Sequence, residues 1–367
     1  GAAVIDRGLP GRLFRGVKRL LGNASVRRLM VFDSPFRLVA LVTPIFLRMR
    51  QSVERVLPGP SQPPSIGRPV LFEGDHTAAT PLALDRLTEA AQYAGFQLSR
   101  FYPEPLAATL SYLHANENDS ANDSEGIALT FDFGGGTLDL SVVRYVGRQF
   151  QVLATKGLPK GGDHIDQLLF ERYLFPELGK GVKWSRRIDG SWVETDFPFK
   201  EFESLLLNWP VTYTLNQNRY RSKIKDCMTD NPESANQLRR LDELITHNYS
   251  YVVFQALRKA KAELSSQATA TIDIPELDLE IEISRHSFES MLTPLLAEID
   301  GLINETLHEA GVDEEAVSLV IRTGGSSLIA CIRDRLNHIF PGKVVEHDPF
   351  TSVAAGLAVA SYHGLTY

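Results

Sequence analysis

The alternation of apolar and polar residues predicts a chain in which short strands and amphipathic helices follow one another. Residues 127–131 form an apolar run, residues 138–142 alternate, and three glycines lie between them, which predicts a β-hairpin. Further strands are expected at residues 66–72, 98–101, 149–154, 268–283 (two strands) and 318–322. Apolar residues at helical spacing predict helices over most of residues 1–55 and over 81–95, 105–112, 167–174, 243–265, 286–310, 328–339 and 352–363. This order is typical of an α/β fold.

Three segments interrupt this pattern. Residues 58–64 hold four prolines and are expected to form a turn or linker. Residues 116–125 are acidic and polar, which predicts a loop and the clearest boundary in the chain. Residues 180–250 mix aromatic and charged residues with weak periodicity, so no element is predicted between them.

The glycine turn of the predicted hairpin carries the main candidate chemistry. Consecutive glycines leave no side chains in the way, so their N–H groups can converge on an anion. Asp132 precedes the turn and Thr137 and Asp139 follow it, which places oxygen ligands where a phosphate-bound Mg²⁺ would lie. The alternative is an ordinary glycine-rich hairpin.

Two further glycine pairs begin helices. Gly161 and Gly162 precede one predicted helix, and Gly324 and Gly325 follow the strand at 318–322. Free N–H groups at a helix entrance suit an anion, although a plain tight turn has the same spacing. Glu104 lies just ahead of another helix, where a carboxylate can face a site. These turns can face one ligand only if the fold brings them together, as a crevice between α/β lobes would.

Composition narrows the function classes. The chain has 367 residues, 43% hydrophobic and 23% charged, which is enough for two domains or one bilobed domain. Its net charge of -7 argues against nucleic-acid binding. Cys227 and Cys331 are too few for a disulfide framework, so a reducing cytoplasm is expected. The longest apolar run, residues 38–47, is too short to span a bilayer, so no membrane partner is expected.

These motifs together resemble a known family. Residues 131–139 resemble the second phosphate-binding hairpin of the DnaK-type heat-shock 70 kDa chaperones, in the actin-like ATPase superfamily. Residues 17–22 are similar to the segment that carries this family's catalytic lysine, and residues 104–108 and 352–358 to its first and second interlobe connections. Residues 161–166 are similar to its glycine pair entering the second lobe, residues 259–266 to the helix that covers the adenine and ribose, and residues 323–327 to its adenosine motif. Residues 66–69 and 348–350 look most like the short YegD-like members, which lack a peptide-binding domain.

The resemblance implies a fold and a division of the chain. The expected fold is the actin-like ATPase fold, two ribonuclease-H-like α/β lobes around a nucleotide crevice. Residues 1–125 would form a partial first lobe. Residues 126–160 and 300–367 would form the core of the second lobe, with the last helix returning towards the first. Residues 161–299 would be an inserted subdomain that covers the nucleotide.

The resemblance also implies ATP or ADP and Mg²⁺ as cofactors, and a role for each site residue. Asp132 and Glu104 would hold Mg²⁺, mostly through water, and Lys18 would contact the transferred phosphoryl group. Asp139 would support the attacking water, and Thr137 would bind phosphate. The remaining implied nucleotide contacts are Gly134, Gly135, Gly136, Gly161, Gly162, Arg258, Lys261, Ser265, Gly324, Gly325 and Ser326.

The sequence also departs from the family. The family has other residues at the positions of Arg258, Leu328 and Phe350. The resemblance therefore supports phosphate binding more strongly than a preference for adenine as the base. The family opens with an apolar-Asp-x-Gly-Thr hairpin. Residues 4–8 only echo that hairpin, because Lys18 follows too soon after them. A crevice with one phosphate hairpin should bind ATP weakly and hydrolyse it poorly.

Two function hypotheses follow from the resemblance. The first is a Mg²⁺-dependent, slowly hydrolysing ATPase of chaperone type without a peptide-binding domain, with a co-chaperone or client as partner. In this hypothesis the full-length protein is active and the present chain is weak or inactive. The second is a non-catalytic nucleotide-binding scaffold or regulatory protein on the same fold. A protein kinase is rejected, because residues 132–134 match its magnesium triplet but no His-Arg-Asp loop lies upstream.

Overall fold

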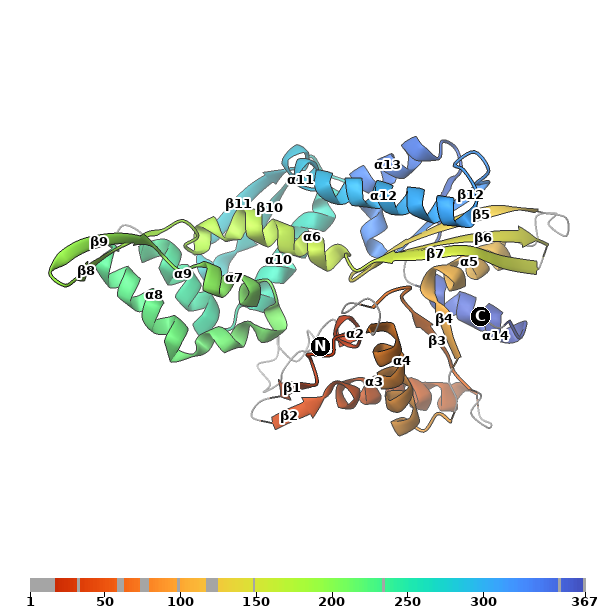
Figure 1. Cartoon of the computed structure of the whole chain (residues 1–367), viewed down its shortest axis with the longest axis horizontal. Helices are drawn as coiled ribbons and strands as arrows, with labels where there is room; N and C mark the ends of the chain where they lie inside the picture. The colour runs from red at the N-terminus through yellow and green to blue at the C-terminus, as the bar shows by residue number, and fades with distance from the viewer. Residues whose placement is uncertain are drawn as a thin grey trace. The chain divides into compact units, whose positions relative to one another are not determined.

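The structure is a computed structural model that describes most of the chain (Figure 1). The described residues are 17–31, 34–57, 63–72, 79–97, 100–116, 125–147, 149–232, 235–348 and 351–365. Residues 4–8, most of the predicted linker at 58–64, the loop at 117–124 and Phe350 lie outside them. The chain divides into two compact units, residues 1–162 with 295–367, and residues 163–294. The predicted division into three parts stays a prediction.

A mixed five-stranded sheet forms the centre of the first unit. Its spatial order is β13–β12–β5–β6–β7. The strands are β5 (Glu125–Phe133), β6 (Leu138–Val146), β7 (Gln149–Leu158), β12 (Leu319–Thr323) and β13 (Val344–Glu346). β5, β6 and β7 form an antiparallel meander, whereas β12 pairs in parallel with both β5 and β13. The meander confirms the predicted hairpin and strand at 127–154.

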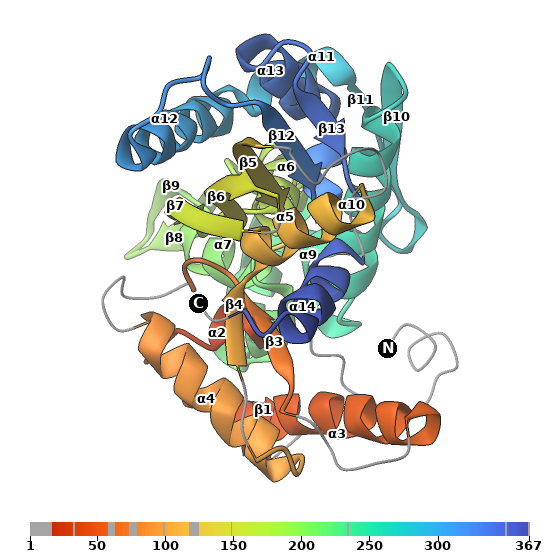
Figure 2. The same cartoon turned by 90° about the vertical axis from the view of Figure 1, so that its right-hand side faces the viewer.

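Both faces of this sheet are covered, which explains the composition of its strands. β5 is buried without interruption from Ala128 to Phe133, and β6 from Leu138 to Val143. Strands buried on both faces are usually near-continuous apolar runs, as β5 largely is. β6 departs from this rule, because Asp139 and Ser141 alternate with its apolar residues and are themselves buried. Helix α5 (Glu104–Ala115) contacts β5 and β6, and both views place α12 (Thr293–Ala310) on the opposite side of the sheet (Figures 1 and 2).

A second, smaller sheet precedes the meander in the chain. β3 (Ser65–Arg68) and β4 (Arg100–Pro103) pair in parallel, and α4 (Ala79–Tyr93) connects them. α4 packs on α3 (Leu38–Val56) around a small apolar core that includes Val39, Val42 and Leu87. α2 (Val17–Leu20) begins the described chain.

The prediction of a mostly helical stretch over residues 1–55 was wrong in part. β1 (Arg28–Val31) and β2 (Ser34–Arg37) form an antiparallel hairpin just before α3. Both strands are largely exposed, and β2 is exposed throughout. A hairpin without a buried face produces no alternating pattern, so its sequence gave no strand signal.

The second unit is mainly helical. Its elements are α6 (Gly162–Leu169), β8 (Lys183–Ile188), β9 (Ser191–Asp196), α7 (Lys200–Leu206), α8 (Asn218–Asp230), α9 (Ala235–Thr246), α10 (Ser250–Leu264), β10 (Thr269–Ile274), β11 (Leu279–Ser284) and α11 (Arg285–Met291). Phe170, Phe175 and Phe202 are fully buried in its core. The predicted strand pair at 268–283 is confirmed by β10 and β11.

Several predicted helices have different bounds in the structure. The long helix expected at 243–265 is broken at Asn248, whose φ of 55° is left-handed, so α9 and α10 are separate. The helix expected at 167–174 begins at Gly162, and the one at 286–310 divides into α11 and α12. A short 3-10 helix (Gly325–Leu328) precedes α13 (Ala330–Ile339). In the part of the chain that is described, no helix is both long and apolar enough for a membrane crossing.

Helices α5 and α14 (Ser352–Tyr362) lie side by side at the centre of the first unit (Figure 2). Gly356 of α14 packs directly on the backbone of α5, because a Cβ built there would lie 1.6 Å from the carbonyl oxygen of Ala107. Only a residue without a side chain permits this separation. The contact therefore depends on a single glycine.

Gly356→Ala is expected to lower the free energy of unfolding of the first unit by about 3 kcal/mol, because the added methyl forces two helices apart. Gly301→Ala in α12 is the matched control, since a Cβ there meets no atom within 4 Å. The control should be neutral or raise stability by about 0.5–1 kcal/mol. Urea denaturation measures both, and equal effects would contradict the close helix contact.

Candidate functional site

Three glycine-containing turns of the first unit meet at the carbonyl group of Gly134. The turn between β5 and β6 is closed by the Gly134 N–H, which donates to the Thr137 carbonyl at 3.0 Å. The Gly162 N–H donates to the Gly134 carbonyl at 3.0 Å, and the Ser326 hydroxyl donates to the same oxygen at 2.8 Å. The fold thus brings together the turn after β7, the turn after β12 and the hairpin turn.

The turn positions are glycine for two different reasons: at some a Cβ would clash with nearby backbone atoms, and at another the space above the backbone is open. A Cβ on Gly161 would lie 2.6 Å from backbone atoms of Gly135 and Gly136. Gly324 has a φ of +81°, and its Cβ would lie 2.5 Å from the Phe133 carbonyl oxygen. Both must be glycine for the turns to approach each other. Gly135 differs, because a Cβ there would meet no atom within 4 Å. Its surface is open to a ligand.

Two carboxylates flank the hairpin turn as a cross-strand pair. Asp132 ends β5 and Asp139 begins β6, and they are partners in the sheet register. Asp132 is 8% exposed and Asp139 is 1% exposed. Asp139 accepts a hydrogen bond from the Val70 N–H at 2.7 Å and another from the Thr137 hydroxyl at 2.6 Å. Asp139 is therefore fixed in place by both of its oxygens.

The burial of these groups changes their protonation. Burial raises the pKa of Asp132 to about 8, and the Glu104 and Asp139 carboxylates add to this effect. Burial also raises the pKa of Asp139 to about 7, although the Thr137 and Val70 hydrogen bonds oppose it. The Lys18 ammonium lowers both pKa values, but less than burial raises them. Even with Lys18 beside it, Asp132 is mostly protonated at neutral pH when no metal ion is bound.

Lys18 and Glu104 complete this cluster. Glu104, the first residue of α5, forms a salt bridge with Lys18 of α2. The Lys18 side chain is 49% exposed and that of Glu104 is 16% exposed. Three carboxyl groups thus act on one another with a single lysine beside them, so the fully ionised cluster is negative. An excess of buried carboxylates suits a divalent cation.

The arrangement does not form a closed metal cage. Among the described residues, no group of three or more His, Cys, Asp or Glu side chains is close enough to ligate an ion directly. Mg²⁺ normally retains several of its waters and uses one or two carboxylates. The cluster of Asp132 and Glu104 therefore fits a hydrated Mg²⁺ that also binds ligand oxygens.

Three of the predicted site residues, Arg258, Lys261 and Ser265, belong to the second unit. Asp166 of α6 is fully buried and pairs with Arg258 and Lys261 of α10. Its Oδ2 lies 2.9 Å from Arg258 Nε, and Arg258 Nη2 lies 3.1 Å from Asp163 Oδ1. The Ser265 hydroxyl donates to the Lys261 carbonyl at 3.3 Å, at the end of α10. These residues join α6 to α10, and their part in nucleotide binding stays a prediction.

Sequence reasoning missed two contributors to the first cluster. A Cβ on Gly157 of β7 would lie 2.8 Å from Asp139 Oδ1, so this strand residue must be glycine. A glycine inside a strand pattern is a usable signal of close approach. Val70 contributes through its backbone N–H, which no side-chain pattern could indicate.

Comparison with known proteins places the chain in a family. Residues 38–190 and 239–362 match the family described as "Hsp70 protein". The chain is 28% identical over 318 residues to "Chaperone protein HscA homolog" of Haemophilus influenzae, which covers 86% of this chain and 39% of that protein. It is 23% identical over 361 residues to "Chaperone protein DnaK" of Methanothermobacter thermautotrophicus, which covers 95% of this chain and 48% of that protein.

The chain thus spans less than half the length of these relatives. The family match nevertheless covers more than half of the chain itself, and the mixed sheet with helices on both faces agrees with the predicted fold class. This protein therefore belongs to the Hsp70 family and has the actin-like ATPase fold that membership implies.

Proposed function

We propose that this protein binds ATP with Mg²⁺ and that the phosphate groups lie against the hairpin turn of residues 134–137. The observation that carries the proposal is the convergence of three glycine turns at the Gly134 carbonyl. In two of these turns, Gly161 and Gly324 must be glycine because a Cβ would clash with neighbouring backbone atoms. A Cβ at Gly135 would meet no atom within 4 Å, so this part of the turn is accessible to a ligand. A glycine turn with an exposed Gly135 beside buried carboxylates is suited to a phosphate that carries a cation.

The carboxyl groups of Asp132 and Glu104 are the proposed partners of a hydrated Mg²⁺. Burial raises the pKa of Asp132 to about 8, so this carboxyl group holds a proton at neutral pH unless a cation favours its ionised form. A bound cation would favour the ionised carboxylate, so ion binding and proton release are coupled. When bound, Mg²⁺ supplies charge neutralisation for the phosphate oxygens.

Three other side chains are suited to catalysis. The half-exposed Lys18 ammonium lies at the edge of the carboxyl cluster, where it can stabilise negative charge that develops on a phosphoryl group. Thr137 donates its hydroxyl proton to Asp139, so its oxygen still has lone pairs that can accept a hydrogen bond. Asp139 in turn is held rigidly, which favours orienting an attacking water.

The nucleoside contacts are proposed from the family resemblance. They comprise Gly161, Gly162, Arg258, Lys261, Ser265, Gly324, Gly325 and Ser326. Arg258 and Lys261 pair with Asp166, and Arg258 also pairs with Asp163, so two carboxylates balance the two cations and little net positive charge is left for a nucleoside. Leu328, at the end of the turn after β12, is 36% exposed and offers an apolar surface in place of a charged one.

The biological role proposed here is that of a chaperone-type protein acting in the cytoplasm, in which the bound nucleotide controls a co-chaperone or client. Both relatives described above carry the name chaperone protein. The resemblance of residues 66–69 to short YegD-like members stays a prediction. The second candidate is a non-catalytic nucleotide-binding scaffold. The Lys18–Glu104 salt bridge favours this candidate, because it occupies the ammonium that would act in hydrolysis.

Gly135→Val should leave the fold intact and weaken ATP binding by about tenfold or more, a loss of about 1.4 kcal/mol. A Cβ at this position meets no protein atom within 4 Å, so the substitution is expected to obstruct a ligand rather than the fold. Isothermal titration with Mg²⁺ and ATP measures the affinity, and circular dichroism confirms the fold. Gly301→Val is the matched control, since its Cβ position is equally open. An unchanged affinity for Gly135→Val would show that the phosphate site lies elsewhere.

Lys18→Ala should reduce ATP turnover by about 10²–10³-fold while ATP still binds. The reason is that the ammonium group stabilises the negative charge that develops on the phosphoryl group during transfer, and not the bound ATP itself. Lys259→Ala is the control, since Lys259 also pairs with a glutamate but is 73% exposed on α10. Phosphate release and ATP titration are measured side by side. ATP binding without any turnover in the unmodified protein would select the scaffold hypothesis.

Asp132→Asn should raise the melting temperature, and the gain should grow with pH between about 4 and about 8. The pKa of Asp132 is raised to about 8 in the folded protein, so the folded state holds more protons than the unfolded state across this range. Stability is therefore lost as pH rises, and asparagine removes that loss. Mg²⁺-ATP affinity should rise with pH in the unmodified protein and be weak and nearly constant in the variant. A gain in melting temperature that does not change with pH would contradict a buried titrating carboxyl.

A further inference from the structure

A single arginine of α4 holds the backbone that follows Lys18. The guanidinium group of Arg86 donates hydrogen bonds to four carbonyl groups of residues 20–26. The bonds join Nη1 to the carbonyl oxygens of Leu20, Leu21 and Asn23, at 3.2, 2.8 and 3.1 Å, and Nη2 to that of Val26, at 3.1 Å. The first of these residues is the last residue of α2, the helix that carries Lys18.

The carbonyl groups at the end of α2 need partners from outside the helix. α2 has four residues, and the last carbonyl groups of a helix have no partner within it. A helix this short also has little stability of its own. A guanidinium group is planar, has five N–H donors in a fixed arrangement and always carries its charge, so it can serve several carbonyl groups at once. Arg86 is therefore suited to fix the end of α2 in place.

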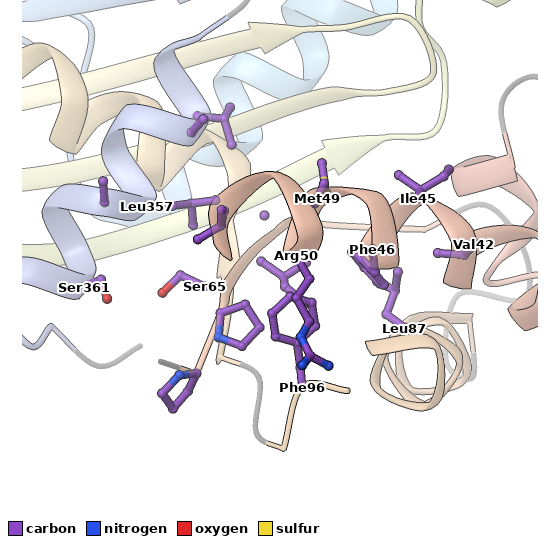
Figure 3. A pocket seen from close by; sticks show the side chains of 18 of the residues that line it. Val42, Ile45, Phe46, Met49, Arg50, Ser65, Leu87, Phe96, Leu357 and Ser361 are labelled. Atoms are coloured by element: carbon purple, nitrogen blue, oxygen red, sulfur yellow. The ribbon is translucent and has the colours of Figure 1, made fainter. Parts of the chain in front are cut away.

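An apolar groove borders α2. It lies beside β3, has a volume of about 990 Å³, and has Val17 and Lys18 among the residues that line it. Figure 3 shows other residues of this groove, among them Leu87, which follows Arg86 in α4. Leu87 and Leu21 belong to the same small apolar core. The residue after α2 is thus anchored in a core, whereas α2 itself borders the groove and depends more on its backbone contacts.

The other end of the Lys18 side chain is held from a different helix. Its ammonium group forms a salt bridge with Glu104, the first residue of α5, at the edge of the carboxyl cluster. The Lys18 side chain is 49% exposed, and exposed salt bridges contribute little to holding a long side chain in one position. The location of the ammonium group therefore depends on where the backbone of α2 is held.

We propose that Arg86 is a positioning residue for Lys18. By fixing residues 20–26, it holds α2 at the distance from the carboxyl cluster at which the ammonium group meets a phosphoryl group. The proposal rests on the proposed function, in which Lys18 stabilises charge that develops on that group. Misplacement of a catalytic group by about 1 Å can cost about a hundredfold in rate. Arg86 acts only through Lys18 and contacts no reacting atom.

Arg86→Gln should lower kcat for ATP hydrolysis by about 10–10²-fold, because Lys18 is no longer held where charge develops. The KM and the affinity for ATP should stay the same, since no contact with bound ATP is removed. Arg86→Lys retains a positive charge and part of the hydrogen bonds, so it should restore part of the lost turnover. Phosphate release and ATP titration measure both variants.

Arg50→Gln is the matched control. Arg50 of α3, labelled in Figure 3, also donates from Nη1 to a carbonyl group, that of Ala94 at 3.0 Å just after α4. It contacts the same helix pair but not residues 20–26, so turnover should not change. Melting temperatures of all variants are measured first, so that turnover is compared where each protein is folded.

A double-mutant cycle separates positioning from a general effect on the fold. In the Lys18→Ala background, Arg86→Gln should lower turnover no further, because the group through which it acts is already absent. A purely structural role would lower turnover in both backgrounds to the same degree.

Acetylation of the Lys18 amine tests the positioning without any turnover. An ammonium group held in a salt bridge reacts slowly, so Lys18 should be acetylated at least about threefold faster in Arg86→Gln, where local opening is easier. Mass spectrometry follows the modification. Lys259 of α10, whose side chain is 73% exposed, is the internal standard and should react equally in all the proteins.

Three outcomes would overturn the proposal. Equal acetylation of Lys18 in the unmodified protein and in Arg86→Gln would show that Arg86 does not fix α2. Unchanged turnover in Arg86→Gln, in a protein that hydrolyses ATP, would show that the position of Lys18 does not depend on Arg86. A further loss of turnover in the Lys18→Ala background would assign Arg86 to the fold alone. Faster acetylation in a protein that hydrolyses no ATP would support the positioning by Arg86 and contradict the proposed catalysis.

Discussion

The carbonyl group of Gly134 is the point on which the candidate site depends. It accepts hydrogen bonds from the Gly162 N–H and the Ser326 hydroxyl, and so joins turns that are far apart in the sequence. This closeness is possible because Gly161 and Gly324 have no side chains where backbone atoms lie within 3 Å of the missing Cβ. Gly161 and Gly324 are packed against backbone atoms of the hairpin, so they have no free surface there. Gly135 is not packed in this way, and its exposed surface is open to a ligand.

The carboxyl cluster beside this turn opposes the stability of the fold. Asp132 and Asp139 are buried, and burial raises the pKa of each by several units above that of a free aspartic acid. A hydrophobic or amide side chain would be tolerated better at the position of Asp132. Natural folds retain such groups mainly where function needs them. The same burial that costs stability suits the site to a cation, because a bound cation would favour the ionised form of carboxyl groups that otherwise hold protons.

The rest of the first unit is organised around the pair α5–α14. α5 contacts strands of both sheets of this unit, α14 contacts β3, and the Gly356 contact fixes how closely the two helices approach. One sheet has five strands and is covered on both faces, whereas β3 and β4 form a two-stranded sheet with an apolar groove beside it. Salt bridges and glycine contacts at the site depend on this frame, since Glu104 begins α5 and Lys18 lies against it.

The sequence by itself determined the elements whose patterns are local. The hairpin at residues 131–143, the strands at 268–283 and the glycine pairs follow from alternation and from conformations that only glycine adopts easily. The tertiary structure decided the rest. The β1–β2 hairpin has no buried face, and Asn248 breaks a helical pattern that continues across it. The contacts of Val70 and Gly157 with Asp139, and the meeting of three turns at Gly134, join residues distant in sequence. No local pattern encodes such contacts, because they depend on how the sheets and helices pack.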